Sequence, residues 1–128
     1  MNNRPLSREL TEKYIRFLIT QSDNLLRDGI AEYEFENLMR EYAKFLYRLL
    51  EDTTIDIALK DDIVALDLFD ANDLKNHVGP VVEGMLSELP FYHQLLKLNE
   101  KLKLQKVRQL KEGMSLLLFK IDGYSFGG

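Results

Sequence analysis

The stretch AEYEFENLMREYAKFLYRLL, residues 31–50, decides the fold of this chain. Its apolar residues recur at the spacing that places side chains on one face of an α-helix, while charged residues take the opposite face. The repeat consists of Phe35, Leu38, Met39, Tyr42, Leu46, Leu49 and Leu50. Tyr33, Phe45 and Tyr47 widen the apolar arc, so we expect a central helix that is buried on more than one flank.

Two further long helices are predicted at the ends of the chain. The first runs from about residue 8 to residue 27, with Ser7 as its N-cap and Gly29 behind its end. The connection to the central helix is so short that the two helices should pack antiparallel. The last long helix runs from residue 91 to about residue 112, where Pro90 opens it and Gly113 ends it.

The region between these helices has a less regular pattern. Residues 55–59 fit either a last turn of the central helix or a short extended piece. Lys60, Asp61 and Asp62 give another helix start, and the apolar run up to Phe69 fits a short helix or a strand equally well. Short helices are predicted at residues 73–78 and 81–88, separated by Gly79 and Pro80.

The C-terminal residues contain a hairpin signal. Asp122 and Gly123 follow an apolar run and favour a tight turn, so residues 114–126 are predicted to form a small β appendage. A helix that continues through Phe119 is the alternative. The fold class that we predict is therefore all-α. A single bundle of about four to six helices covers residues 1–113, and a short β or irregular appendage covers residues 114–128.

Composition excludes several classes of protein. The chain has 128 residues, a formal net charge of −4 and no cysteine, which rules out a disulfide scaffold, a thiolate metal site and a cysteine nucleophile. The length suits one domain. No signal-like apolar run opens the chain, and the longest strictly apolar run, residues 116–119, is far too short to span a membrane. We expect a cytoplasmic protein.

The clearest candidate site is the basic side of the last long helix. Residues 90–112 contain six basic and two acidic residues, although the chain as a whole is acidic. On a helix, Lys97, Lys101, Arg108 and Lys111 fall within about 80° of one another and form a line roughly 20 Å long. Such a line suits an acidic protein partner or the phosphates of a nucleic acid. The alternative is a solvated helix face with no binding role.

Other polar groups give no catalytic or metal-binding pattern. Asp61, Asp62, Asp67, Asp70 and Asp73 lack the glycine and glutamate offsets of a calcium loop, and helix capping accounts for them better. His77 and His93 stand apart, with no metal-ligand spacing and no nucleophile arranged around them. We therefore predict no catalytic residue, metal, cofactor or small-molecule substrate, and keep an acid–base site near either histidine only as a formal alternative.

The aromatic residues of the central helix suggest an interface. Tyr33, Phe45 and Tyr47 cannot all face inward together with Phe35 and Tyr42, and exposed aromatic side chains on a helix often mark a contact surface. We predict that these three residues bind a protein partner or a second copy of the chain.

The central helix resembles one in the helical domain of archaeal GINS subunits. That helix begins with glutamates and an asparagine and continues to leucines, an arginine, and an isoleucine before a small residue. The matching residues here are Glu34, Glu36, Asn37, Leu46, Arg48, Ile57 and Ala58. Residues 91–96, FYHQLL, resemble the Phe-Tyr opening of a later helix in that family. The chain departs from the family pattern at Asp56, where a lysine is usual, and it leaves only some 15 residues for a β domain of about 50.

The resemblance implies a non-enzymatic replication subunit. Such a subunit would tetramerise through its helices and bridge the MCM helicase ring to its partners. Our functional expectation is accordingly a non-catalytic assembly or scaffold subunit that binds other proteins through helical surfaces, in a DNA replication complex. The alternative is a small helical protein that binds nucleic acid through the basic helix face. No membrane partner is expected.

Overall fold

A computed structural model describes residues 6–29, 31–69 and 90–127. Within these residues the chain forms five α-helices and no strand, which confirms the all-α prediction. The helices are α1 (Arg8–Asp28), α2 (Glu32–Glu51), α3 (Ile57–Ala65), α6 (Pro90–Leu96) and α7 (Glu100–Phe119), and a 3-10 turn, η2 (Ile121–Gly123), follows them. The helices predicted at 73–78 and 81–88 lie outside the described residues.

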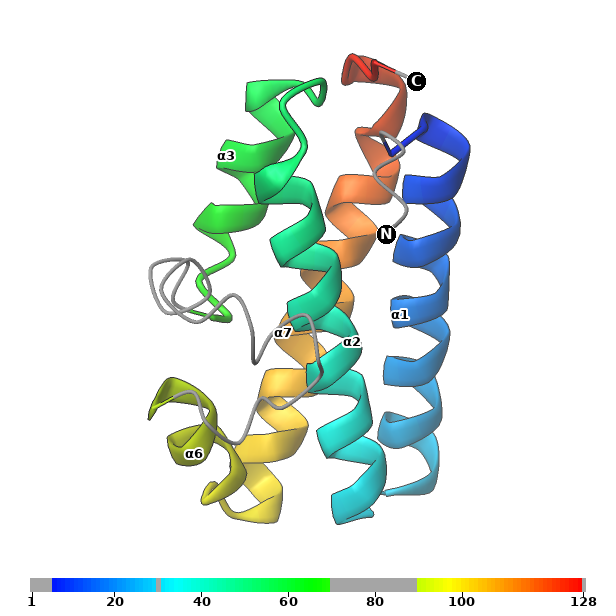
Figure 1. Ribbon diagram of the computed structural model, residues 1–128. Coiled ribbons are helices and arrows are strands. Elements are labelled where there is room, and N and C mark those ends of the chain that lie inside the picture. The colour runs from blue at the N-terminus through cyan, green and yellow to red at the C-terminus, as the bar shows by residue number, and fades with distance from the viewer. Residues whose placement is uncertain (1–5, 30, 70–89, 128) are drawn as a thin grey trace.

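The three long helices, α1, α2 and α7, lie side by side, and two short helices share the fourth side of the bundle (Figure 1). Helix α3 covers the upper half of that side and α6 the lower half. Helices α1 and α2 run antiparallel, as their short connection predicts. Helix α7 also runs antiparallel to α1, because Arg8 pairs with Asp122 while Asp23, near the other end of α1, pairs with Lys111.

Helix α1 begins and ends where the sequence predicts. The Oγ of Ser7 accepts a hydrogen bond from the backbone N–H of Leu10 at 3.0 Å, which satisfies a donor that the first turn leaves free. At the other end Gly29 has φ of 89°, a conformation that residues with a side chain rarely adopt. Its backbone N–H donates to the carbonyl of Leu25 at 3.0 Å and closes the helix.

Helix α2 supplies the largest share of the buried core. Its Phe45 stacks on Tyr14 of α1, with ring centroids 5.4 Å apart, and the backbone carbonyl of its Glu36 accepts a hydrogen bond from the hydroxyl of Tyr92 on α6. The buried residues of α2 are Phe35, Leu38, Met39, Tyr42, Ala43, Phe45, Leu46 and Leu49. They span about 160° of the helix at 100° per residue, so several neighbours are needed to cover them.

Helix α3 starts earlier than the acidic residues at 61 and 62 indicate. The Oδ1 of Asp56 accepts a hydrogen bond from the backbone N–H of Ala58 and caps the helix. Residues 57–59 therefore open α3, and both predictions for residues 55–59, a last turn of the central helix and a short extended piece, are wrong, because α2 already ends at Glu51. The apolar run up to Phe69 is helical as far as Ala65.

The predicted single helix over residues 91–112 is wrong, because the chain breaks between α6 and α7. After Leu96 the backbone N–H of Lys97 bonds to the carbonyl of Gln94, a tighter turn that leaves the α-helix. Asn99 then starts α7, and its Oδ1 accepts from the N–H of Leu102 at 2.9 Å. An asparagine N-cap followed by a glutamate is the sequence signal for this break.

The predicted β appendage is also wrong. Helix α7 passes through Gly113 and ends at Phe119, as the alternative prediction has it, and Asp122 and Gly123 lie in η2. Gly113 faces α3, where an added Cβ would lie 2.7 Å from the Cδ1 of Leu66. The glycine is thus a helix-packing residue, and a domain boundary at residue 113 would fall inside α7.

Three aspartates form hydrogen bonds with Leu6, which precedes α1, and with Tyr124 and Ser125, which follow η2. Asp52 accepts from the backbone N–H of Leu6 at 2.7 Å. Asp56 and Ser125 exchange two hydrogen bonds, in which the Ser125 N–H donates to Asp56 Oδ2 and the Asp56 N–H donates to the Ser125 carbonyl. Asp62 accepts from the hydroxyl of Tyr124 at 2.6 Å. Ile121 and Tyr124 consequently belong to the core, as do the helices before them.

We expect Gly113→Val to lower the free energy of unfolding by about 1–3 kcal/mol, because the new side chain overlaps Leu66. Urea denaturation followed by circular dichroism measures the change. The matched control is Glu112→Val, which puts the same residue at the exposed neighbouring position. Equal stabilities of the two variants would contradict the close α3–α7 contact.

We expect the attachment of the C-terminal segment to α3 to weaken in acid, because it depends on the carboxylate of Asp56. Hydrogen bonds from the backbone N–H groups of Ser125 and Ala58 lower the pKa of Asp56, so the ionised form favours the fold. This contribution is complete well above the unfolded pKa of about 4 and disappears as the pH falls through the lower folded value. Asp56→Asn keeps the helix cap but loses the acceptor for Ser125. Its Tm should lie below wild type at neutral pH, and the gap should close in acid.

The control is Asp61→Asn on the exposed side of α3, whose Tm should follow wild type at every pH. A Tm gap for Asp56→Asn that stays constant from neutral pH to pH 3 would show that the charge of Asp56 does not hold the segment.

Candidate partner-binding surface

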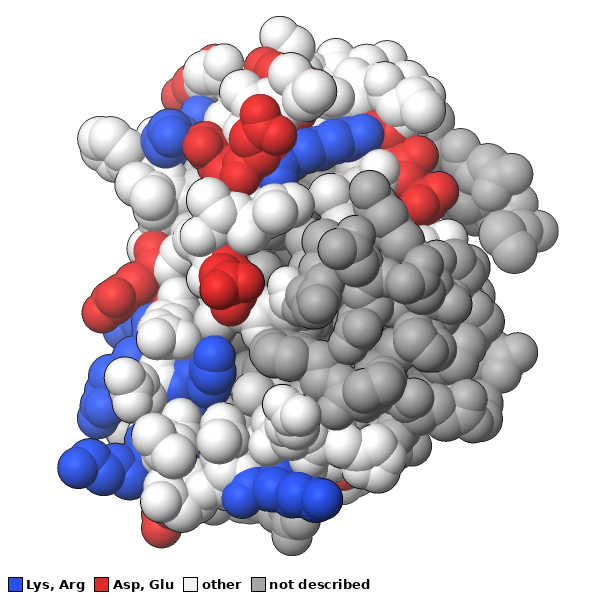
Figure 2. Space-filling model, turned by 90° about the vertical axis from the view of Figure 1, so that its left-hand side faces the viewer, with Lys and Arg blue, Asp and Glu red and all other residues white. Residues whose placement is uncertain are grey.

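The structure separates the four predicted basic residues. Lys101, Arg108 and Lys111 lie on α7, but Lys97 lies in the turn between α6 and α7. They therefore do not form a line along one continuous helix. Figure 2 shows that Lys and Arg side chains gather over the lower part of one face of the molecule, whereas Asp and Glu side chains gather in its upper part.

Lys111 belongs to the contact between α1 and α7. Its Nζ lies 2.5 Å from Asp23 Oδ1, and each of the two side chains keeps less than half of its surface exposed. The sequence could not reveal this pairing, because it depends on the antiparallel register of two helices nearly 90 residues apart in the chain. Lys111 is thus partly neutralised inside the monomer.

Four basic residues in this region are free of such partners. Lys97, Lys101, Lys106 and Arg108 have no ion pair with any residue in the described part of the chain, and all except the half-buried Lys106 are exposed. We call these four residues the basic surface. Lys103, which lies between them in sequence, instead places its Nζ 5.3 Å from the centre of the Phe35 ring. That position suits a cation–π contact.

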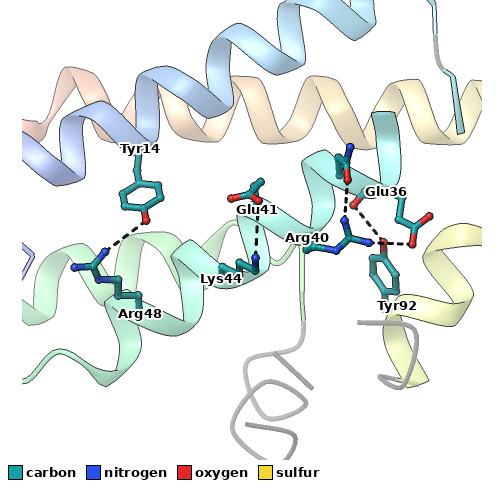
Figure 3. Close-up of polar contacts among 8 residues, drawn as sticks. Tyr14, Glu36, Arg40, Glu41, Lys44, Arg48 and Tyr92 are labelled. Carbon is teal, nitrogen blue, oxygen red and sulfur yellow. Dashed lines mark hydrogen bonds and ion pairs between the residues drawn. The ribbon is translucent and has the colours of Figure 1, made fainter. Parts of the chain in front are cut away.

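Most basic residues on the other two long helices do have partners. On α1, Arg16 pairs with Glu12 and Arg27 with Asp28. On α2, Arg40 contacts Glu36, and Lys44 lies 4.0 Å from Glu41. Figure 3 shows these α2 contacts together with Arg48, which donates to the hydroxyl of Tyr14 at 3.4 Å. The grouping of several basic residues without ion pairs therefore distinguishes the basic surface from α1 and α2, where Lys13 is the single basic residue for which no described partner is found.

The predicted aromatic surface of α2 does not form as a unit. Phe45 is 1 % exposed and stacks on Tyr14, so its prediction as an interface residue is wrong. Successive helical residues turn by 100°, which puts Phe45 and Tyr47 about 160° apart around α2. Tyr33 is 71 % exposed and Tyr47 is half-buried, and these two side chains remain available to a partner.

The outer side of α7 carries exposed apolar residues that the sequence reading missed. Leu102 is 41 % exposed, while Leu116 and Phe119, which lie in the segment predicted as a β appendage, are 51 % and 88 % exposed. The signal that could have found them is the spacing of the core residues Val107, Leu110 and Met114, which fixes the inner side of the helix.

Of the acidic residues and histidines considered as candidates, the structure describes Asp61, Asp62, Asp67 and His93. Asp62 is occupied by Tyr124 and Lys120, and His93 is exposed on α6. Asp70, Asp73 and His77 lie outside the described residues. Across residues 6–29, 31–69 and 90–127 no three His, Asp or Glu side chains are grouped so as to hold a metal ion.

None of the helices in the described part of the chain is long and apolar enough to cross a lipid bilayer. Comparisons of the chain with models of protein families, with curated proteins and with solved structures give no match.

The pairing of Lys111 predicts a structural role for that residue. Lys111→Ala should lower the free energy of unfolding by at most about 1 kcal/mol, as is usual for a surface ion pair. A double-mutant cycle with Asp23→Ala should show coupling between the two residues. If the changes in the free energy of unfolding of the two substitutions are fully additive, Asp23 does not hold Lys111, and Lys111 is again a candidate binding residue.

Proposed function

We propose that this protein is a non-catalytic assembly subunit that binds an acidic partner protein through the basic surface. The observation that supports this proposal is a group of four basic side chains that have no ion pair with any described residue, in an otherwise acidic chain. Charges left unpaired on a surface raise the association rate with a partner of opposite sign and help to select that partner.

A protein partner suits the surroundings of the basic surface better than a single-stranded nucleic acid does. Tyr92, the described aromatic residue nearest to it in sequence, is 1 % exposed and donates its hydroxyl hydrogen to α2. Among the described side chains nearest to the basic surface in sequence, no exposed aromatic ring therefore offers a platform for base stacking. By contrast, Leu102 lies exposed directly beside Lys101, and apolar side chains next to cations suit a protein interface.

The resemblance of α2 to a helix of archaeal GINS subunits supplies the proposed setting. Glu34, Glu36 and Asn37 lie in the first turns of α2, but Ile57 and Ala58 open α3, so the residues of this pattern lie on two helices here and not on one. Within this proposal the chain acts as a scaffold in a DNA replication complex, with exposed Tyr33 as a second contact.

The test is a pull-down with the tagged full chain from lysate of the source cells, with nuclease present, read by mass spectrometry. We expect proteins recovered with wild type to fall by about tenfold or more with the Lys101→Glu, Arg108→Glu double variant, because reversed charge repels an acidic partner. Lys13→Glu is the control, since Lys13 is an exposed lysine of α1 with no ion pair among the described residues. Equal recovery with all three proteins would contradict the proposal.

The second candidate function, direct nucleic-acid binding, is favoured by the same unpaired cations. It predicts that recovered proteins disappear when nuclease is added. It also predicts that the purified chain binds duplex DNA with an affinity that falls steeply as salt rises. A salt-independent or undetectable affinity for duplex DNA would exclude this candidate.

A further inference from the structure

The outer side of α7 has the residue spacing of a coiled-coil seam. Exposed residues recur along it at alternating steps of three and four, and all six lie within about 100° of one another around the helix. They are Leu102, Gln105, Gln109, Glu112, Leu116 and Phe119, which we call the outer seam. Its two ends are apolar, and Phe119 is the most exposed large apolar residue of the described chain, at 88 %.

Basic residues border the first half of this seam on both edges. Lys101 and Arg108 directly precede Leu102 and Gln109, and Lys106 directly follows Gln105. In coiled-coil terms they occupy the flanking g and e positions, whose charges choose the partner and its orientation. No residue in the described ranges pairs with any of the three.

We propose that the outer seam of α7 docks an acidic amphipathic helix of the partner protein. This inference rests on the proposed function and specifies the chemistry of the partner. Apolar residues of the incoming helix cover Leu102, Leu116 and Phe119, and its flanking carboxylates pair with Lys101, Lys106 and Arg108. Helix-in-groove binding of this kind is a common mode of peptide recognition.

The flanking charges disfavour a second copy of α7 as the occupant. In a parallel pair, Lys101 of one copy faces Lys106 of the other, five residues further along. In an antiparallel pair, the g positions face each other and bring Lys101 close to Arg108. Both arrangements place like charges together, which opposes self-association and favours an acidic helix.

The middle of the seam is polar and gives the contact its register. Gln105, Gln109 and Glu112 stand between the apolar ends. Polar residues at seam positions cost affinity but reject partners that are shifted along the helix. The docking helix should accordingly carry hydrogen-bonding residues opposite the two glutamines.

The test uses two labelled helical peptides of about 21 residues, three heptads long. Both have Leu at a and d, except for a Gln opposite each polar seam position. One carries Glu and the other Lys at e and g. Fluorescence anisotropy with the full chain should show binding of the acidic peptide alone. We expect Phe119→Ser and the Lys101→Glu, Arg108→Glu variant each to raise its Kd by about tenfold or more.

Phe17→Ser is the control, because Phe17 is a 45 % exposed aromatic residue on α1, and this variant should keep the wild-type Kd. Thermal melts verify that each variant is folded. The proposal is overturned if the acidic peptide does not bind or if both peptides bind equally. It is also overturned if a DNA duplex of about 20 base pairs, which is stiff because it is much shorter than the persistence length of DNA, binds more tightly than the acidic peptide. If one of these results is obtained but the Lys101→Glu, Arg108→Glu variant still loses its partners in the pull-down, the proposed function stands and only the docked helix is excluded.

Discussion

The structure depends on the burial of one wide apolar arc on α2. Eight of its side chains are almost fully buried, and they span too much of the helix for one neighbour to cover. Helix α1 covers the edge that contains Phe45, and α6 reaches the other end of α2 through Tyr92. Phe69, which follows α3, packs against Tyr42 with ring centroids 5.5 Å apart. The arc of α2 is thus covered by its neighbour in sequence, α1, and by two elements further along the chain, the residues after α3 and helix α6.

The two sides of helix α7 differ: the inner side is buried in the bundle and the outer side is exposed. Its inner side carries Val107, Leu110, Gly113, Met114 and Leu117, which are buried against the bundle. Its outer side combines unpaired cations with exposed leucine and phenylalanine. Neither feature stabilises an isolated monomer: exposed apolar surface gains nothing in water, and these cations have no carboxylate partner among the described residues. A complementary partner of the kind proposed above would make both features favourable.

The sequence predicts those parts of the fold whose signals are local. Ser7 and Gly29 mark the ends of α1 because a hydroxyl acceptor and a left-handed residue are needed there in any context. The arc of α2 follows from its spacing. Gly113 was misread as a helix end, because the same residue serves equally well for close packing, and only Leu66 on another helix distinguishes the two uses.

The candidate surface could be predicted only in part, because some of its features depend on contacts between helices that are far apart in the sequence. An excess of basic residues in one segment is visible in the chain, but the pairing of Lys111 with Asp23 and the stacking of Phe45 on Tyr14 require the tertiary arrangement. The break at Asn99 was within reach of the sequence, since asparagine before glutamate is a common helix start.

If a partner docks on α7 as we propose, the outer side of that helix is covered in the native assembly. Amine-reactive footprinting can test this by comparing lysine labelling of the purified chain with labelling of the chain inside assemblies isolated from its own cells. The proposed docking predicts that Lys101 and Lys106 become protected while Lys13 on α1 keeps its full reactivity. Unchanged labelling of Lys101 and Lys106, or equal protection of Lys13, would contradict a specific docking surface on α7.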